Sequence, residues 1–198
     1  WNKNITVLGQ ITGAGALRVL NDGGRVVLAN GANDYGGDTI IGGTPSSGTV
    51  ARLQVGASDA IPHGAGAGNV VFANQSGILY LDGFDETING LEKTSTGTAT
   101  VEAASGTPTL SVGAGDTTSS FAGILADGGG TLSLAKIGTG TLTLTGANAD
   151  ERVPVRGTDV APVAAMLAER VGVAPDGPLG ATIASLSGSP AASRLSAR

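Results

Sequence analysis

The segment KIGTGTLTLTGAN, residues 136–148, has glycine and then leucine at every second position. In a β-strand, successive side chains point to opposite faces, so Leu142 and Leu144 share one face and the threonines beside them occupy the other. A looser version of the segment, NDGGRVVLANGAN, covers residues 21–33. The pattern indicates short strands that are separated by tight turns.

Short apolar runs of the same kind lie between these two segments, at residues 70–72, 78–81, 109–112 and 132–134. In the run 78–81 both strand faces are apolar. Each run is bounded by Gly, Asn, Asp or Ser, which tolerate positive φ or form turns through their side chains. We therefore predict an all-β protein with many turns.

Composition supports this class. Glycine accounts for 34 of the 198 residues, whereas aromatic residues make up only 3%. Glycine shows no triplet period and there are only 8 prolines, so the chain is not collagen-like. The abundance of aliphatic and β-branched side chains argues against disorder.

Repetition separates the remaining all-β architectures. A shift of 115 residues pairs Leu17 with Leu132, Val27 with Leu142, and Asn33 with Asn148. One unit that recurs at this distance, with different strands between the copies, favours a solenoid over a sandwich. A propeller would have more even blades of about 40–50 residues.

We therefore predict a right-handed parallel β-helix over residues 1–149, with two degenerate repeat copies at about 11–41 and 126–148. At roughly 20–25 residues per coil, about six or seven coils are expected. Aliphatic side chains should stack inside in columns, and the interior should be too narrow for bulky side chains. The expected interior leucines of the second copy are Leu132, Leu134, Leu142 and Leu144.

Residues Gly13–Ile41, GAGALRVLNDGGRVVLANGANDYGGDTII, resemble the autotransporter-associated β-helix repeat, also called the passenger-associated transport repeat. That family has a Gly-x-Gly-x-Leu opening, a Leu-x-Leu-x-Gly-x-Asn centre and an Asn-x-Tyr-x-Gly-x-Thr close. The close is supplied here by Asn33, Tyr35, Gly37 and Thr39. The resemblance implies a β-helical segment of a bacterial passenger protein.

Further segments extend the resemblance over about three quarters of the chain. Residues 53–72 and 77–91 resemble the stretch that usually follows such a repeat, and residues 130–148 match the repeat better than the first copy does. The first copy has Asn21 and Arg25 where the second has Lys136 and Gly140. The second copy lacks its close, since Asp150, Arg152 and Pro154 stand in the places of Tyr35, Gly37 and Thr39.

Composition changes to Ala, Arg, Val and Pro in residues 150–198. Residues 158–172 predict an amphipathic helix, and its apolar face consists of Val160, Val163, Ala164, Leu167 and Val171. Two interpretations remain open. The segment could cap the end of the solenoid, where strand edges would otherwise invite association, or it could dock onto a neighbouring subunit.

No candidate catalytic set, cofactor site or metal site is assigned. Asp82, Asp85 and Glu86 form the densest acidic cluster, and paired carboxylates serve glycoside hydrolysis. The resemblance places them at a turn where polar residues are routine, so we predict a solvated corner. His63 is the sole histidine and lies in another turn, which leaves no support for a catalytic triad or a zinc site.

Three weaker signals complete the inventory. The segment GAGAGN, residues 64–69, lacks the glycine spacing of a dinucleotide-binding loop and is predicted to be an ordinary loop. Surface pairing is expected between arginines and aspartates on one flank, namely Arg18 and Arg25 with Asp22 and Asp34. Asn4 and Asn74 each begin a glycosylation acceptor pattern, which arises often by chance.

Charge excludes one class of partner. Residues 1–150 carry six basic and twelve acidic side chains, and the whole chain has a net charge of −5. Nucleic-acid binding needs a clustered basic face, which is absent here. No apolar run reaches the length of a transmembrane helix, so no membrane insertion by this chain is expected.

Together these patterns predict a non-enzymatic extracellular structural or adhesive β-solenoid module of a bacterial surface or secreted protein. The absence of cysteine agrees with this location. Expected partners are further copies, end to end or through residues 150–198, or a host or matrix glycan or protein. The alternative is a carbohydrate-active β-helix, either a polysaccharide lyase or hydrolase or a glycan-binding surface.

Overall fold

The computed structural model describes residues 4–20, 24–42 and 50–145. These residues form β1 (Ile5–Val7), β2 (Leu17–Val19), β3 (Val26–Leu28), β4 (Thr39–Ile41), β5 (Ala51–Val55), β6 (Val70–Phe72), β7 (Gly77–Asp82), β8 (Glu86–Ile88), β9 (Leu91–Lys93), β10 (Ala99–Ser105), β11 (Thr109–Val112), β12 (Ser119–Phe121), β13 (Ile124–Ala126), β14 (Ser133–Lys136) and β15 (Leu142–Leu144). This part of the chain contains strands and turns and no helix.

The chain divides into two units, residues 1–153 and 154–198, and only the first contains described residues. The helix predicted over residues 158–172, and with it the whole segment 150–198, lies outside the described residues.

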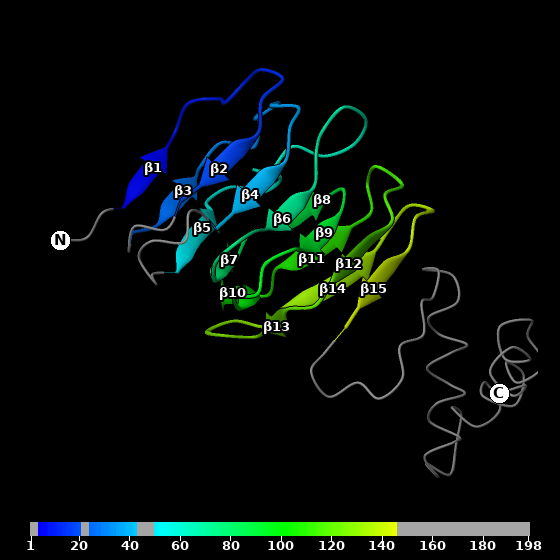
Figure 1. The fold of residues 1–198 in the computed structure, drawn as a ribbon. Coiled ribbons are helices and arrows are strands. Elements are labelled where there is room, and N and C mark those ends of the chain that lie inside the picture. Colours follow the sequence, from blue (N-terminus) through cyan, green and yellow to red (C-terminus); the bar gives the residue numbers. More distant parts are fainter. Residues whose placement is uncertain (1–3, 21–23, 43–49, 146–198) are drawn as a thin grey trace, which may run out of the picture. The chain divides into compact units, whose positions relative to one another are not determined.

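Every described strand pair is parallel, and the strands of successive coils stack side by side into parallel sheets (Figure 1). The longest sheet has the order β1-β3-β5-β7-β10-β13, a second has β2-β4-β6-β9, a third β14-β11-β8, and a fourth β12-β15. The chain visits the sheets in rotation, as in β7, β8, β9 and then β10, β11, β12. This is a parallel β-solenoid, and the predicted fold class is confirmed for this unit.

The number of coils follows from the longest sheet. Its strands align in one column formed by Ile5, Val26, Leu53, Leu79, Val101 and Leu125. The steps between these residues are 21, 27, 26, 22 and 24, so the column spans five turns of unequal length. The six strands of this sheet belong to six successive coils, which agrees with the predicted six or seven.

Inward side chains stack in register over successive coils. Beside the column just named, a second one contains Leu28, Val55, Leu81 and Ala103. Leu53, Leu79 and Leu81 are fully buried, whereas Ile78 and Tyr80 on the outer face of β7 are half-buried. Period-two alternation thus produces a closed aliphatic interior, because each buried residue packs between equivalents in the coils on either side.

The interior also holds aromatic side chains, so the expectation that bulky residues are excluded is wrong. Phe72 and Phe121 are both buried, and their ring centroids lie 5.7 Å apart. The position that pairs with Phe72 in β9 is the half-buried Lys93. Since this coil contributes no apolar side chain at that position, we infer that the two rings fill the space from either side.

The two repeat copies do not occupy equivalent positions in the coil. Residues 26–28 form β3 in the longest sheet, whereas their counterparts 141–143 overlap β15 (Leu142–Leu144), which pairs with β12 in another sheet. The distance of 115 residues that relates the copies therefore does not bring the chain back to the same sheet. The repeated motif therefore identifies a strand followed by a turn, but it does not identify the sheet to which that strand belongs.

The last described coil buries its leucines only in part. Leu142 is 8% exposed, but Leu134 and Leu144 are 37% and 44% exposed. Among the described strands, β14 pairs only with β11, and β15 only with β12. The predicted interior leucines of this coil therefore have a packing partner on one side only.

Turns stack as closely as strands, which explains part of the glycine content. Gly113 has a φ of 118°, and a Cβ added there would lie 2.1 Å from the carbonyl oxygen of Ile137 in the next coil. Gly64 has a φ of 84°, but an added Cβ would meet nothing within 4 Å. The first glycine is required by backbone conformation and by close approach, the second by conformation alone.

These two glycines separate the cost of conformation from the cost of stacking. We expect Gly64→Ala to lower the free energy of unfolding by about 1–2 kcal/mol, the cost of left-handed backbone for alanine. Gly113→Ala should lower it clearly more, because the added methyl group must also push the next coil away. Urea unfolding of both variants measures the difference, and equal losses would contradict coil-to-coil stacking at Gly113.

Neighbouring residues of β7 test the interior column in the same way. Leu79→Ala should lower the free energy of unfolding by about 2–5 kcal/mol, since it leaves a cavity between two coils. Ile78→Ala, one residue away on the outer face, should cost less than about 1 kcal/mol. Losses of similar size in chemical denaturation would show that the two faces of β7 are not inside and outside as described.

Candidate functional site

Glu86, at the start of β8, points into the interior. Its side chain is 1% exposed, and its carboxyl oxygens Oε2 and Oε1 accept backbone N–H groups of Ala60 at 3.0 Å and Ile61 at 2.9 Å. The solvated corner predicted for Asp82, Asp85 and Glu86 is therefore wrong for Glu86. Asp85 is exposed, as predicted for a solvated corner, whereas Asp82 is half-buried. Glu86 lies two residues before the buried Ile88, and this spacing could have identified it as an inward position.

Burial changes the acidity of two interior groups. Desolvation raises the pKa of the Glu86 carboxyl to about 8, against the opposing effect of the Ile61 and Ala60 amides; the charge of Asp59 raises it further. Burial likewise raises the pKa of Tyr35 to about 12, although its hydroxyl shares a 2.6 Å hydrogen bond with Thr39. Glu86 is therefore largely protonated at neutral pH.

The surroundings of Glu86 close it off from external substrates. The coil below presents the amides of residues 60 and 61, and the coil above presents the buried Leu110, which pairs with Glu86 in register. A general acid must come within hydrogen-bond reach of the group it protonates. Glu86 is positioned to hold two coils together rather than to meet a substrate.

Two buried asparagines make similar links between coils. Asn33 accepts the Ile11 N–H through Oδ1 at 2.8 Å and donates from Nδ2 to the Ala60 carbonyl at 2.7 Å. Asn89 accepts from the Gly64 N–H at 2.7 Å and donates to the Gly64 and Ala67 carbonyls. Each side chain thus satisfies backbone groups of loops that leave the ladder.

On the outer face of the longest sheet, polar side chains form a chain of contacts across four coils. The Arg25 guanidinium donates to Gln54, and Gln54 donates to Asp82 at 2.7 Å. Asp82 also accepts a hydrogen bond from the Ser105 hydroxyl at 2.8 Å. The Arg25 guanidinium carbon lies 4.8 Å from the centre of the Tyr80 ring, a cation–π geometry that places the cation over one face of the ring.

The remaining sequence candidates are dispersed. His63 is exposed in the loop before β6, and residues 64–69 form a loop as predicted. Arg25 contacts Gln54 and Tyr80 rather than Asp34, and Asp22 lies outside the described residues. The first residues of both acceptor patterns, Asn4 and Asn74, are exposed.

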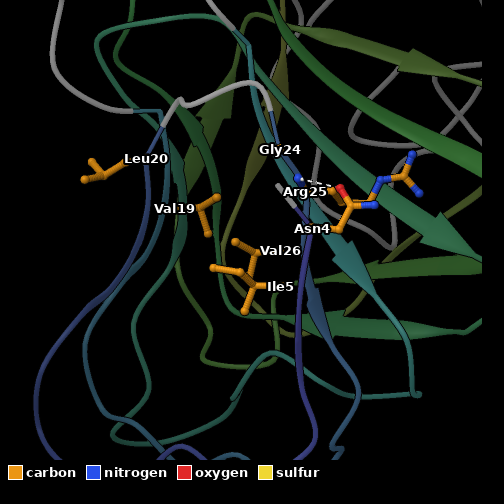
Figure 2. Close-up of a pocket in the computed structure, with 7 residues that line it drawn as sticks. All are labelled: Asn4, Ile5, Val19, Leu20, Gly24, Arg25 and Val26. Atoms are coloured by element: carbon orange, nitrogen blue, oxygen red, sulfur yellow. Dashed lines mark hydrogen bonds between the residues drawn. The ribbon is translucent and has the colours of Figure 1, made fainter. Parts of the chain in front are cut away.

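A hollow of about 300 Å³ lies at the first coil and is lined by Asn4, Ile5, Val19, Leu20, Gly24, Arg25 and Val26. In Figure 2 the side chains of Ile5, Val19 and Val26 point toward one another, whereas Arg25 extends away from them. At the rim of the hollow, the backbone N–H of Arg25 donates a 3.2 Å hydrogen bond to Asn4 Oδ1. The hollow is therefore an apolar opening into the interior of the first coil.

Two classes of site find no support in the part of the chain that the structure describes. Within it, no three His, Asp or Glu side chains are grouped so that they could hold a metal ion. The same residues contain no helix that is long and apolar enough to span a membrane.

Comparison of the chain with protein-family models, with curated proteins and with solved structures finds no match. The site must therefore be interpreted from its own residues.

Glu86→Gln tests the buried carboxyl. Because its pKa is higher in the folded than in the unfolded state, folding takes up a proton between about pH 4.5 and pH 8. The stability of the parent chain relative to the variant should fall as pH rises through this range and should be constant above and below it. Denaturation of both proteins at several pH values measures this difference. A constant difference from pH 4 to pH 9 would contradict the pKa shift.

Proposed function

We propose that the chain is a non-enzymatic structural or adhesive module of the extracellular surface or secretions of a bacterium. The observation that carries the proposal is how the polar groups are used. The most perturbed acid, Glu86, is sealed between coils, and the outer side chains Arg25, Gln54 and Asp82 bond to one another. The polar side chains named here therefore link coils, which supports a structural role.

Continuous parallel ladders suit a structural role. Each coil adds backbone hydrogen bonds and an aliphatic layer to the previous one, so stability accumulates with length. A segment of this kind can hold a binding region away from a cell surface. The resemblance of residues 13–41 to the passenger-associated transport repeat supports the extracellular and bacterial part of the proposal, and the absence of cysteine agrees with it.

An adhesive role would use the loops and the outer faces. Residues 56–69 form a long connection between β5 and β6, and this loop exposes His63. Loops on a rigid scaffold are the usual location of binding residues. Partners of this surface would be a host or matrix glycan or protein.

A carbohydrate-active function is the second candidate, and one observation favours it. Tyr80 and Glu102 are paired on adjacent strands, and Asp82 lies on the same outer face two residues from Tyr80. Aromatic rings with nearby carboxylates are a common composition for sugar contacts. Against this candidate, Arg25 already covers one face of the Tyr80 ring.

Surface exposure can be measured on intact cells of the source organism with antibodies raised against the purified chain. We expect labelling without permeabilisation, and loss of the label after brief protease treatment of whole cells. A cytoplasmic protein that remains protected until lysis serves as the control. Labelling only after permeabilisation would contradict the extracellular assignment.

The carbohydrate-active alternative is tested by incubating the chain with neutral and acidic polysaccharides, with and without Ca²⁺. We expect neither new reducing ends nor unsaturated products. If cleavage occurs, Asp82→Asn and Glu102→Gln should each be compared with Glu92→Gln, a carboxylate on the second sheet. Cleavage that is lost only in the first two variants would establish the alternative.

A further inference from the structure

The last coil of the described solenoid presents an apolar end. Its exposed aliphatic side chains are Leu134, Ile137 and Leu144, with exposed fractions of 36–44%. The strands of this coil, β13, β14 and β15, each pair with a single described strand. Among the described residues, this end therefore has strand edges without a partner as well as exposed apolar side chains.

The first coil presents a complementary apolar end. Ile5, Leu8 and Leu20 are 59%, 73% and 55% exposed, and β1 pairs only with β3 among the described strands. This coil is hollowed, because the opening of about 300 Å³ between Ile5, Val19 and Val26 leads into its interior. The first coil thus has a recess, and the last described coil has exposed apolar side chains.

Strand polarity fixes how the two ends could meet. Every described strand pair is parallel, so the free edge of β13 is the natural continuation of the edge that β1 presents. A contact of first coil to last coil would keep all strands parallel. Such a contact uses two different surfaces of the molecule and does not close on itself, so it builds linear assemblies.

We propose that the occupant of the recess is the last coil of a second copy of this chain, stacked head to tail. This proposal rests on the structural function proposed above and adds its partner. The stack continues the columns of the solenoid: Leu125 of one copy packs on Ile5 of the next, and Leu144 packs on Val19. Leu144 is thereby placed at the recess, where Ile5 is 59% exposed and Val19 is buried.

The register of this stack follows from columns already present. Ile5 and Leu125 begin and end the column of the longest sheet, so their contact repeats an aliphatic pair that occurs in every turn. In the second sheet, the Leu91 N–H donates to the Ser119 hydroxyl, which aligns β12 with β9. Leu142 of β15 pairs with Ser119 and would therefore lie on Leu17, the corresponding residue of β2.

The side chains that would meet in this register carry no opposing charges. On the outer face of the longest sheet, Ala126 would lie beside Thr6, and on the second sheet Thr143 would lie beside Arg18. Neither position brings like charges together. Edge strands that should stay free usually carry inward-pointing charges, prolines or bulges, and neither β1 nor β13 contains a charged residue or a proline.

The test uses the full chain and blocks each end separately. Leu144→Asp blocks the last coil and Ile5→Asp blocks the first; each replaces a side chain that is already partly exposed, so both variants should fold. Phe84→Asp is the matched control, because Phe84 is 38% exposed at a corner between β7 and β8 in the middle of the solenoid. Circular dichroism confirms that the three variants keep the β-fold.

Sedimentation velocity over a hundredfold range of concentration gives the readout. The parent chain and Phe84→Asp should form assemblies that lengthen with concentration, whereas each end variant alone should remain a monomer. Mixing the two end variants should give a dimer and nothing larger, because each supplies the one free end that the other lacks.

Several outcomes would overturn the stacking. One is a parent chain that stays monomeric at every concentration, as expected if residues 146–198 of the same chain cover an end. Another is that the end variants associate like the parent. A dimer formed by one end variant alone would indicate a symmetric contact instead. The cell-surface labelling described above is independent of all these outcomes, so failure of stacking leaves the proposed location intact.

Discussion

The parallel backbone ladder is the constraint on which the rest of the fold depends. Because each strand must hydrogen-bond to the equivalent strand of the next coil about 4.8 Å away, every inward side chain is forced onto a column of equivalents. The column from Ile5 to Leu125 is the direct result. The same constraint makes turns stack, so that Gly113 has no room for a side chain below Ile137.

Polar groups in the interior become understandable in these terms. Where the chain leaves the ladder to form a corner, backbone N–H and carbonyl groups lose their strand partners and must find others. Asn33, Glu86 and Asn89 supply those partners from an adjacent coil. A carboxyl in the interior therefore does not signal catalysis; it replaces the missing ladder bonds at residues 60 and 61.

Sequence reasoning could reach the class of fold but not the depth of particular residues. Alternation and turn residues identified segments 70–72 and 109–112 as strands, since both signals are local. The inward position of Glu86 and the contact of Phe72 with Phe121 depend on which coil lies next to which, and unequal coil lengths hide that from a periodic pattern. For the same reason the similarity of residues 21–33 to 136–148 does not mark equivalent positions.

Unequal coil lengths have a consequence for engineering and divergence. Steps of 21 to 27 residues all return the chain to the same column, so the ladder sets the phase while the connections between strands absorb the difference. A connection such as residues 56–69 can thus be exchanged as a cassette, with peptides of other lengths and chemistries grafted between β5 and β6. The scaffold offers a display site whose contents can vary while the neighbouring strands keep their alignment.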